Sequence, residues 1–113
     1  MDITRGDTFD IKFQRKNKNK EVIKEQPDKM YFTVKQDDNT VDTIFQKTLG
    51  DGSISFDSET YYYNLTIEPE DTNDLDYGTY YYDIEVIIGT KVKTIAKGTI
   101  NITSEITFSV NEV

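Results

Sequence analysis

Apolar and polar residues alternate with a period of two through most of this chain, and nowhere does a helical period persist. Side chains of a strand point alternately to its two faces, so each alternating segment is expected to bury one face and expose the other. The segments are residues 9–13, 30–35, 41–47, 54–56, 61–68, 80–88 and 91–102. Together they predict an all-β protein with about eight strands in two packed sheets.

The longest and cleanest alternation, residues 80–88, and the returning alternation of residues 91–102 predict a long β-hairpin. The Gly-Thr pair in its middle suits a two-residue turn, because glycine adopts positive φ without steric cost. Lys91 and Lys93 are then expected on the polar face, opposite Asp83 or Glu85. Strict alternation places a second set on the buried face of the returning strand: Val92, Thr94, Ala96, Gly98, Ile100 and Ile102.

Residues 65–82 have the pattern of a sharp corner between two strands. Pro69 can begin a helical turn, because the first helical position needs no N–H donor. After Asp76, Gly78 permits a tight bend at the start of the next strand. Tyr80 is the candidate corner tyrosine, whose hydroxyl is expected to bond backward to the preceding backbone.

This corner resembles that of immunoglobulin-like domains, and the resemblance implies their fold. A chain of 113 residues is one domain by the usual size rule. We therefore expect a single immunoglobulin-like β-sandwich over residues 1–113, with about seven to nine antiparallel strands. Residues 104–113 are expected to add an edge strand or to form an arm. Tyr82 stands where antibody domains have their second cysteine, so the expected sandwich lacks that disulfide.

Composition narrows the chemistry. The chain has no Cys and no His, which removes disulfides, the commonest zinc ligand and the commonest general base. Its many carboxylates fall on polar strand faces or in turns, where solvent keeps pKa values ordinary. We expect a non-enzymatic protein without a cofactor. The formal net charge of −8 opposes nucleic-acid binding, and no apolar run approaches the roughly 20 residues that span a bilayer.

Three short motifs suggest sharper functions. The basic run 15–20 is expected to be a solvated loop, with a phosphate contact as the alternative. The tripeptide Arg5-Gly6-Asp7 matches an adhesion motif but precedes a strand. A group of carboxylates near one end could in principle hold Ca²⁺, although its spacing matches no calcium loop: Glu68, Glu70, Asp71, Asp74 and Asp76.

The eight tyrosines suggest a contact surface. On the alternation pattern Tyr62 and Tyr81 face outward, and on neighbouring strands they would form an aromatic patch suited to protein binding. Edge strands are the second candidate interface, because their unpaired backbone can bind another chain. The candidates are the N-terminal segment and the alternating residues Ile106, Phe108 and Val110.

Four segments resemble small phage or prophage structural proteins, in particular the N-terminal domain of baseplate upper proteins. They are residues 3–9 (ITRGDTF), 31–35 (YFTVK), 45–47 (FQK) and 77–86 (YGTYYYDIEV). The resemblance implies a structural or adaptor component of a phage tail, baseplate or related particle. Its partners would be other tail or baseplate proteins and copies of itself. It would be made in the bacterial cytoplasm and end in the virion.

Two alternatives from other classes stay open. A carbohydrate- or receptor-binding module would stack sugars on Tyr62 and Tyr81 or on the loops at one end. A small acidic phage-encoded inhibitor would bind one basic host protein tightly, as the net charge of −8 allows.

Overall fold

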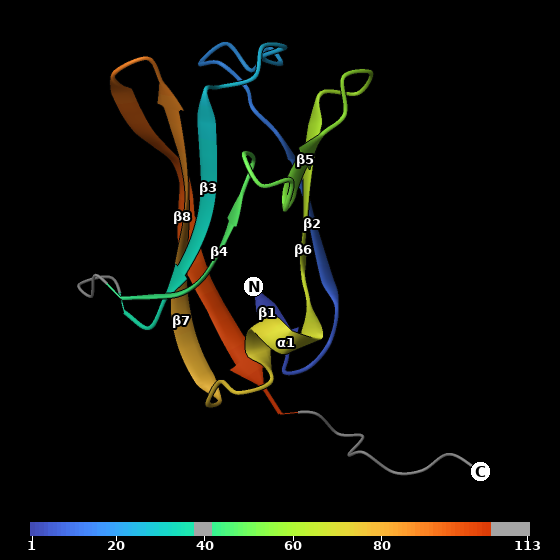
Figure 1. The fold of residues 1–113 in the computed structure, drawn as a ribbon, viewed down its shortest axis with the longest axis vertical. Coiled ribbons are helices and arrows are strands. Elements are labelled where there is room, and N and C mark those ends of the chain that lie inside the picture. Colours follow the sequence, from blue (N-terminus) through green and yellow to red (C-terminus); the bar gives the residue numbers. More distant parts are fainter. Residues whose placement is uncertain (38–41, 105–113) are drawn as a thin grey trace.

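The computed structural model describes residues 1–37 and 42–104, which form two β-sheets and one short helix (Figure 1). The predicted all-β, two-sheet architecture is confirmed. In chain order the elements are β1 (Asp2–Thr4), β2 (Phe9–Gln14), β3 (Lys29–Lys35), β4 (Thr43–Thr48), β5 (Ile54–Phe56), β6 (Tyr62–Ile67), α1 (Pro69–Thr72), β7 (Gly78–Ile88) and β8 (Lys91–Thr103).

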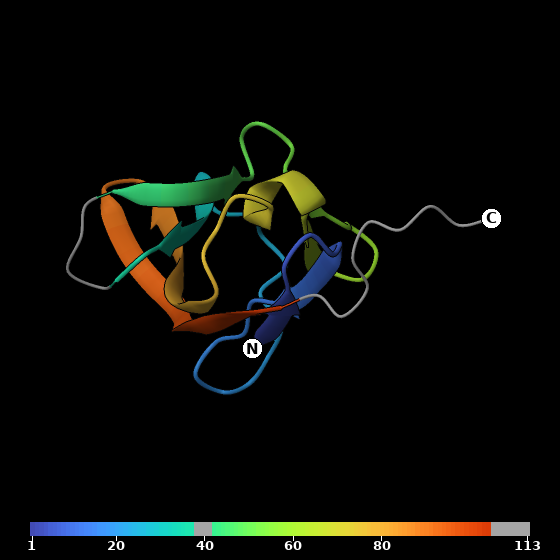
Figure 2. The same ribbon diagram turned by 90° about the horizontal axis from the view of Figure 1, so that it is seen from below.

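The chain crosses repeatedly between the sheets. One sheet has five strands in the order β1-β8-β7-β3-β4, and the other has three in the order β2-β6-β5. β1 runs parallel to β8, whereas the other pairs are antiparallel. Seen along the long axis, the sheets lie on opposite sides of the molecule and α1 lies near the opening between them (Figure 2).

The core lies between the inner faces of the two sheets. It contains the alternate residues that the sequence pattern placed inside, so those expectations are confirmed for β3, β6 and most of β7. Burying each such side chain stabilises the fold by about 1.5–3 kcal/mol. The fully or nearly fully buried apolar residues are Ile3, Met30, Phe32, Val34, Ile54, Tyr63, Leu65, Ile67, Tyr80, Ile84, Val86, Ile100 and Ile102.

The hairpin of β7 and β8 departs from the predicted alternation. Ile84 lies opposite Ala96, but Glu85 lies opposite Thr94, so β8 carries one additional residue, Ile95. Such a β-bulge reverses the two faces of the strand for every residue beyond it. The prediction that Val92 and Thr94 are buried is therefore wrong, and Val92 is 60% exposed.

The same bulge moves two lysines to the inner face. Lys93 lies opposite Val86 and Lys91 lies opposite Ile88, both on the side that β7 turns toward the core. The predicted pairing of these lysines with Asp83 or Glu85 is wrong for that reason. The tip of the hairpin therefore presents these two positive charges on its inner face, at the edge of the apolar core, and not on its outer face.

The turn of this hairpin is anchored to the loop between β2 and β3. Gly89 has φ of +61°, as expected for a two-residue turn. Its N–H donates to Oδ2 of Asp28 at 2.6 Å, while the N–H of Asp28 donates to the carbonyl of Ile87 at 2.9 Å. The loop 15–28 and the tip of the hairpin therefore form one end of the molecule, which we call the loop end.

The edges of the sheets agree only in part with the predicted interfaces. β1 does lie at an edge of the five-stranded sheet, as expected for the N-terminal segment. Ile106, Phe108 and Val110 lie outside the described residues, as does all but the first residue of the expected edge strand or arm at 104–113. At the opposite edge of this sheet, Lys47 of β4 lies beside Phe32 of β3 on the inner face. An inward-pointing charge of this kind discourages an edge from pairing with other chains.

Candidate functional site

The end opposite the loop end, which we call the corner end, holds the predicted corner residues together. Pro69 is the first residue of α1, and Gly78 begins β7 with φ of +140°. The hydroxyl of Tyr80 donates to the backbone carbonyl of Asp76 at 2.8 Å, which is the backward bond expected of a corner tyrosine. Burial, and next the nearby Asp76 carboxylate, raise the pKa of Tyr80 above its ordinary value.

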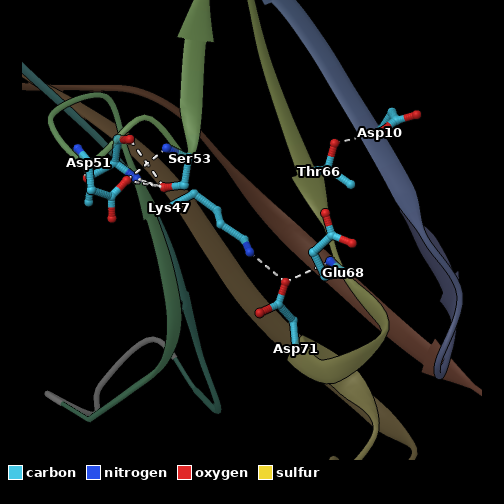
Figure 3. Close-up of polar contacts among 8 residues, drawn as sticks. Asp10, Lys47, Asp51, Ser53, Thr66, Glu68 and Asp71 are labelled. Carbon is cyan, nitrogen blue, oxygen red and sulfur yellow. Dashed lines mark hydrogen bonds and ion pairs between the residues drawn. The ribbon is translucent and has the colours of Figure 1, made fainter.

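A lysine that sequence reasoning missed ties the corner to the five-stranded sheet. Lys47 of β4 reaches Asp71 of α1, with Nζ 2.6 Å from Oδ2 (Figure 3). The same carboxylate oxygen accepts the N–H of Glu68 at 2.7 Å, at the start of the helix. Both side chains are mostly buried, with 12% and 16% of their surface exposed. The sequence contained one sign that Lys47 points inward: it lies two residues after Phe45, so the two side chains fall on the same face of the strand.

The Arg5-Gly6-Asp7 tripeptide is engaged in the corner. The N–H of Gly6 donates to Oγ1 of the fully buried Thr72 at 2.8 Å. The Arg5 guanidinium lies 4.3 Å from the centre of the Tyr77 ring and donates to the carbonyl of Leu75 at 3.2 Å. These contacts give the tripeptide a structural role, in which its arginine and glycine fix the N-terminal turn to the corner.

The acidic residues of the corner form a surface. Among residues 1–37 and 42–104, no group of three or more acidic side chains is arranged to hold a metal ion, so no calcium site is described there. Asp71 is already bound by Lys47. The exposed members, which we call the corner carboxylates, are Glu70, Asp74 and Asp76. They lie in the same short segment as Tyr77, an aromatic side chain that is 49% exposed.

The predicted tyrosine patch is wrong. Tyr62 lies on β6 of the three-stranded sheet, and Tyr81 lies on β7 of the five-stranded sheet. The ring of Tyr62 is covered by Lys12, whose Nζ lies 4.4 Å from the ring centre. Tyr81 is 37% exposed on the outer face, between Lys35 and Thr99 of the neighbouring strands. The outer faces of the two sheets point away from each other, so these two tyrosines do not form one patch.

The loop end contains a pocket of about 420 Å³ between the hairpin and the loop 15–28. The β-bulge shapes it, since Ile95 is the extra residue and turns into the lining. Its apolar lining comes from β2, the loop and both strands of the hairpin: Phe13, Ile23, Ile84, Val86, Ile88 and Ile95.

The remaining lining is mainly cationic and includes no carboxylate. Arg15 is buried, and its guanidinium donates to the carbonyl of Glu25 at 3.0 Å. The expectation that the whole run 15–20 is a solvated loop is therefore wrong for Arg15, although residues 16–20 are exposed. Three exposed lysines complete the lining, and we call them the rim lysines: Lys16, Lys91 and Lys93. Within the described part of the chain, none of the three makes an ion pair.

The two ends therefore differ in charge. Residues 15–28 and 88–93 of the loop end contain seven cations and three carboxylates. Residues 68–77 of the corner end contain five carboxylates and no cation, and the two cations that contact this segment, Arg5 and Lys47, leave it with a net negative charge. In a chain with a formal net charge of −8, the loop end is a local positive region.

No helix in the described ranges is long and apolar enough to cross a bilayer. Comparison with models of known protein families gave no match. A search among curated proteins also found none. What the chain does is therefore inferred from its residues and their arrangement.

Proposed function

We propose that this chain is a non-enzymatic structural or adaptor component of a phage tail, baseplate or related particle. It acts through protein–protein surfaces, binding other tail or baseplate proteins and copies of itself. It is made in the bacterial cytoplasm and incorporated into the virion. The proposed place in a phage particle is supported by a resemblance to phage structural proteins, which four segments carry: residues 3–9, 31–35, 45–47 and 77–86.

We also propose that the sandwich is of the immunoglobulin-like type. In that fold the first, second, fifth and fourth strands form one sheet, and the third, sixth and seventh form the other. With β4 counted as an added edge strand, the order β2-β6-β5 matches the second, fifth and fourth strands, and the neighbours β3, β7 and β8 match the third, sixth and seventh. β1 departs from the pattern, because it pairs with β8 in the five-stranded sheet. The bond from Tyr80 to Asp76 supports the immunoglobulin-like assignment independently, because it occupies the corner before the penultimate strand.

The observation that carries the protein-binding role is the pocket at the loop end. An apolar centre surrounded by polar and charged side chains is the usual anatomy of a protein interface. The rim lysines are free of ion pairs within the described residues, so they are available to a partner's carboxylates. Binding other proteins requires an apolar centre with charged surroundings of this kind and does not require catalytic side chains.

The test is to express the tagged chain in its source cells, induce any resident prophage and sediment the lysate. Mass spectrometry then identifies the fraction that holds the tagged chain. Co-sedimentation with large particles and with tube or baseplate proteins is the expected result. A chain that stays in the light fraction, bound to one host protein, would instead favour the inhibitor.

A carbohydrate-binding module is the second candidate, and one observation favours it. A shallow groove on the outer face of the five-stranded sheet brings Tyr81 together with the polar residues Asp83, Lys97 and Thr99. Tyrosine rings and flanking polar groups can hold a sugar. Titration with cell-wall glycans would reveal such binding, and Tyr81→Ala should abolish it. Unchanged binding in this variant would exclude the groove.

A further inference from the structure

The two ends of the sandwich have complementary charge, and each offers an apolar feature that suits the other. We propose that the pocket at the loop end binds the corner end of a second copy of this chain. Tyr77 of that copy occupies the pocket, and its corner carboxylates contact the rim lysines. This contact deepens the proposed function and rests on its claim that copies of the chain bind one another.

The pocket has the chemistry for such an occupant. Its lining is apolar on both the hairpin side and the loop side, where Val86 and Ile23 lie. An aromatic side chain is the typical anchor in a pocket of this kind at protein interfaces. The cations around it would be satisfied by carboxylates beside that anchor. Arg15 already donates to a backbone carbonyl, which leaves the rim lysines to make the contact.

Tyr77 is a suitable anchor because it is exposed and yet held in place. Its side chain is 49% exposed, and the Arg5 guanidinium lies 4.3 Å from the ring centre. A ring that is already oriented loses less conformational entropy when it binds. Asp74 and Asp76, both exposed, lie next to it in the sequence and supply the negative charge.

The positions of the two surfaces determine the kind of assembly. They lie toward opposite ends of a molecule whose longest dimension is 50 Å (Figure 1). A contact between different surfaces of identical copies leaves one free pocket and one free corner, so it can repeat. The expected product is a head-to-tail series of copies. The net charge of −8 on each copy opposes it, so the local attraction between the ends must outweigh the overall repulsion.

The purified chain tests this directly by sedimentation velocity over a range of concentrations. At about 50 mM salt we expect dimers and longer species to grow with concentration. Raising the salt to about 500 mM should weaken the association about tenfold, because exposed charges are then screened. A single monomeric species at the highest concentration in low salt would overturn the proposal and leave the pocket to a different partner.

Charge reversal at the rim gives a sharper result. Lys91→Glu/Lys93→Glu should weaken association at least about tenfold, because like charges would face one another. Lys35→Glu/Lys97→Glu is the matched control, since it makes the same change in net charge on the outer face of the same sheet. The control should associate as the wild type does, after a small general decrease. An equal loss in both variants would overturn the proposal.

Two further variants identify the occupant. Tyr77→Ala should weaken association to a similar extent while leaving the circular dichroism spectrum unchanged. Asp74→Lys/Asp76→Lys alone should also associate at least about tenfold more weakly, but its mixture with Lys91→Glu/Lys93→Glu should associate again, because both contacts regain opposite charges. A mixture that associates no better than either variant alone would overturn the contact. The proposed function is tested separately, because a chain that is monomeric on its own can still sediment with phage particles.

Discussion

At the residue scale, two buried tyrosines differ in what their hydroxyls bind. The hydroxyl of Tyr80 donates to the carbonyl of Asp76, whereas the hydroxyl of Tyr63 has no hydrogen-bond partner among the described residues. A buried polar group stabilises a protein when it is hydrogen-bonded and costs free energy when it is not. The same substitution should therefore have opposite effects at the two positions.

Tyr80→Phe is expected to lower the free energy of unfolding by about 0.5–1.5 kcal/mol, the usual contribution of one hydrogen bond. Urea titration followed by circular dichroism measures it. An unchanged unfolding curve would show that the corner bond contributes nothing to stability.

The pH dependence of this difference follows from the raised pKa of Tyr80, which burial causes first. The unfolded chain ionises this phenol near its ordinary pKa of 10.0, while the folded protein holds the proton to higher pH. Its contribution is complete below pH 10 and is lost as the pH rises through the folded pKa. Above pH 10 the wild type should lose stability faster than Tyr80→Phe. Parallel curves would contradict the shift.

Tyr63→Phe is expected to raise the free energy of unfolding by about 1 kcal/mol, because it removes an unbonded hydroxyl from the core. The ring would keep its contacts, since Tyr63 stacks on Phe13 with centroids 5.4 Å apart and lies 4.8 Å from Phe56. The same urea titration measures the change. Destabilisation would mean that the hydroxyl has a partner after all.

At the element scale, α1 connects the N-terminal turn to the edge strand β4 at the corner end. Its Thr72 accepts the N–H of Gly6, and its Asp71 binds Lys47 of β4. Thr72→Val keeps the shape but removes the acceptor, so it should lower the free energy of unfolding by about 1–3 kcal/mol. Thr72→Ser, which retains the hydroxyl, is the control and should lose less. An unchanged free energy of unfolding in Thr72→Val would show that the bond contributes nothing, and a larger loss in Thr72→Ser would show that packing of the methyl group decides.

Alternation along the sequence predicted which faces of β3 and β6 are buried, because that property depends on neighbouring residues alone. Turn chemistry predicted the hairpin at Gly89 and the corner at Tyr80 for the same reason. The bulge at Ile95 escaped prediction, because Val92 and Thr94 continue an acceptable alternation in either register. Ile95 packs against the core, and this contact with distant residues is a tertiary effect that local alternation does not reveal.

The candidate site was the harder part to predict. Tyr62 and Tyr81 both face outward as expected, but the sheet to which a strand belongs depends on pairing between distant segments. The pocket depends on the bulge and on a loop that folds back onto the hairpin through Asp28. Neither leaves a local signature, so the rim lysines looked like ordinary solvent-facing residues in the sequence.

At the scale of the whole molecule, the fold places a positive pocket and a negative corner at opposite ends of an elongated sandwich (Figure 1). Neither surface needs a cofactor or a reacting group to act, and both suit contacts between proteins. On the contact that we propose between copies, the distribution of charge rather than its total governs assembly.

If this chain is a structural part of a phage particle, as we propose, particles should not assemble normally without it. The most direct measurement is to delete its coding sequence from the source cells, induce the prophage and count complete particles by electron microscopy. We expect incomplete tails or baseplates, with complete particles restored by the wild-type chain and much less well by Lys91→Glu/Lys93→Glu. Complete, infectious particles at the normal yield after deletion would contradict the proposal.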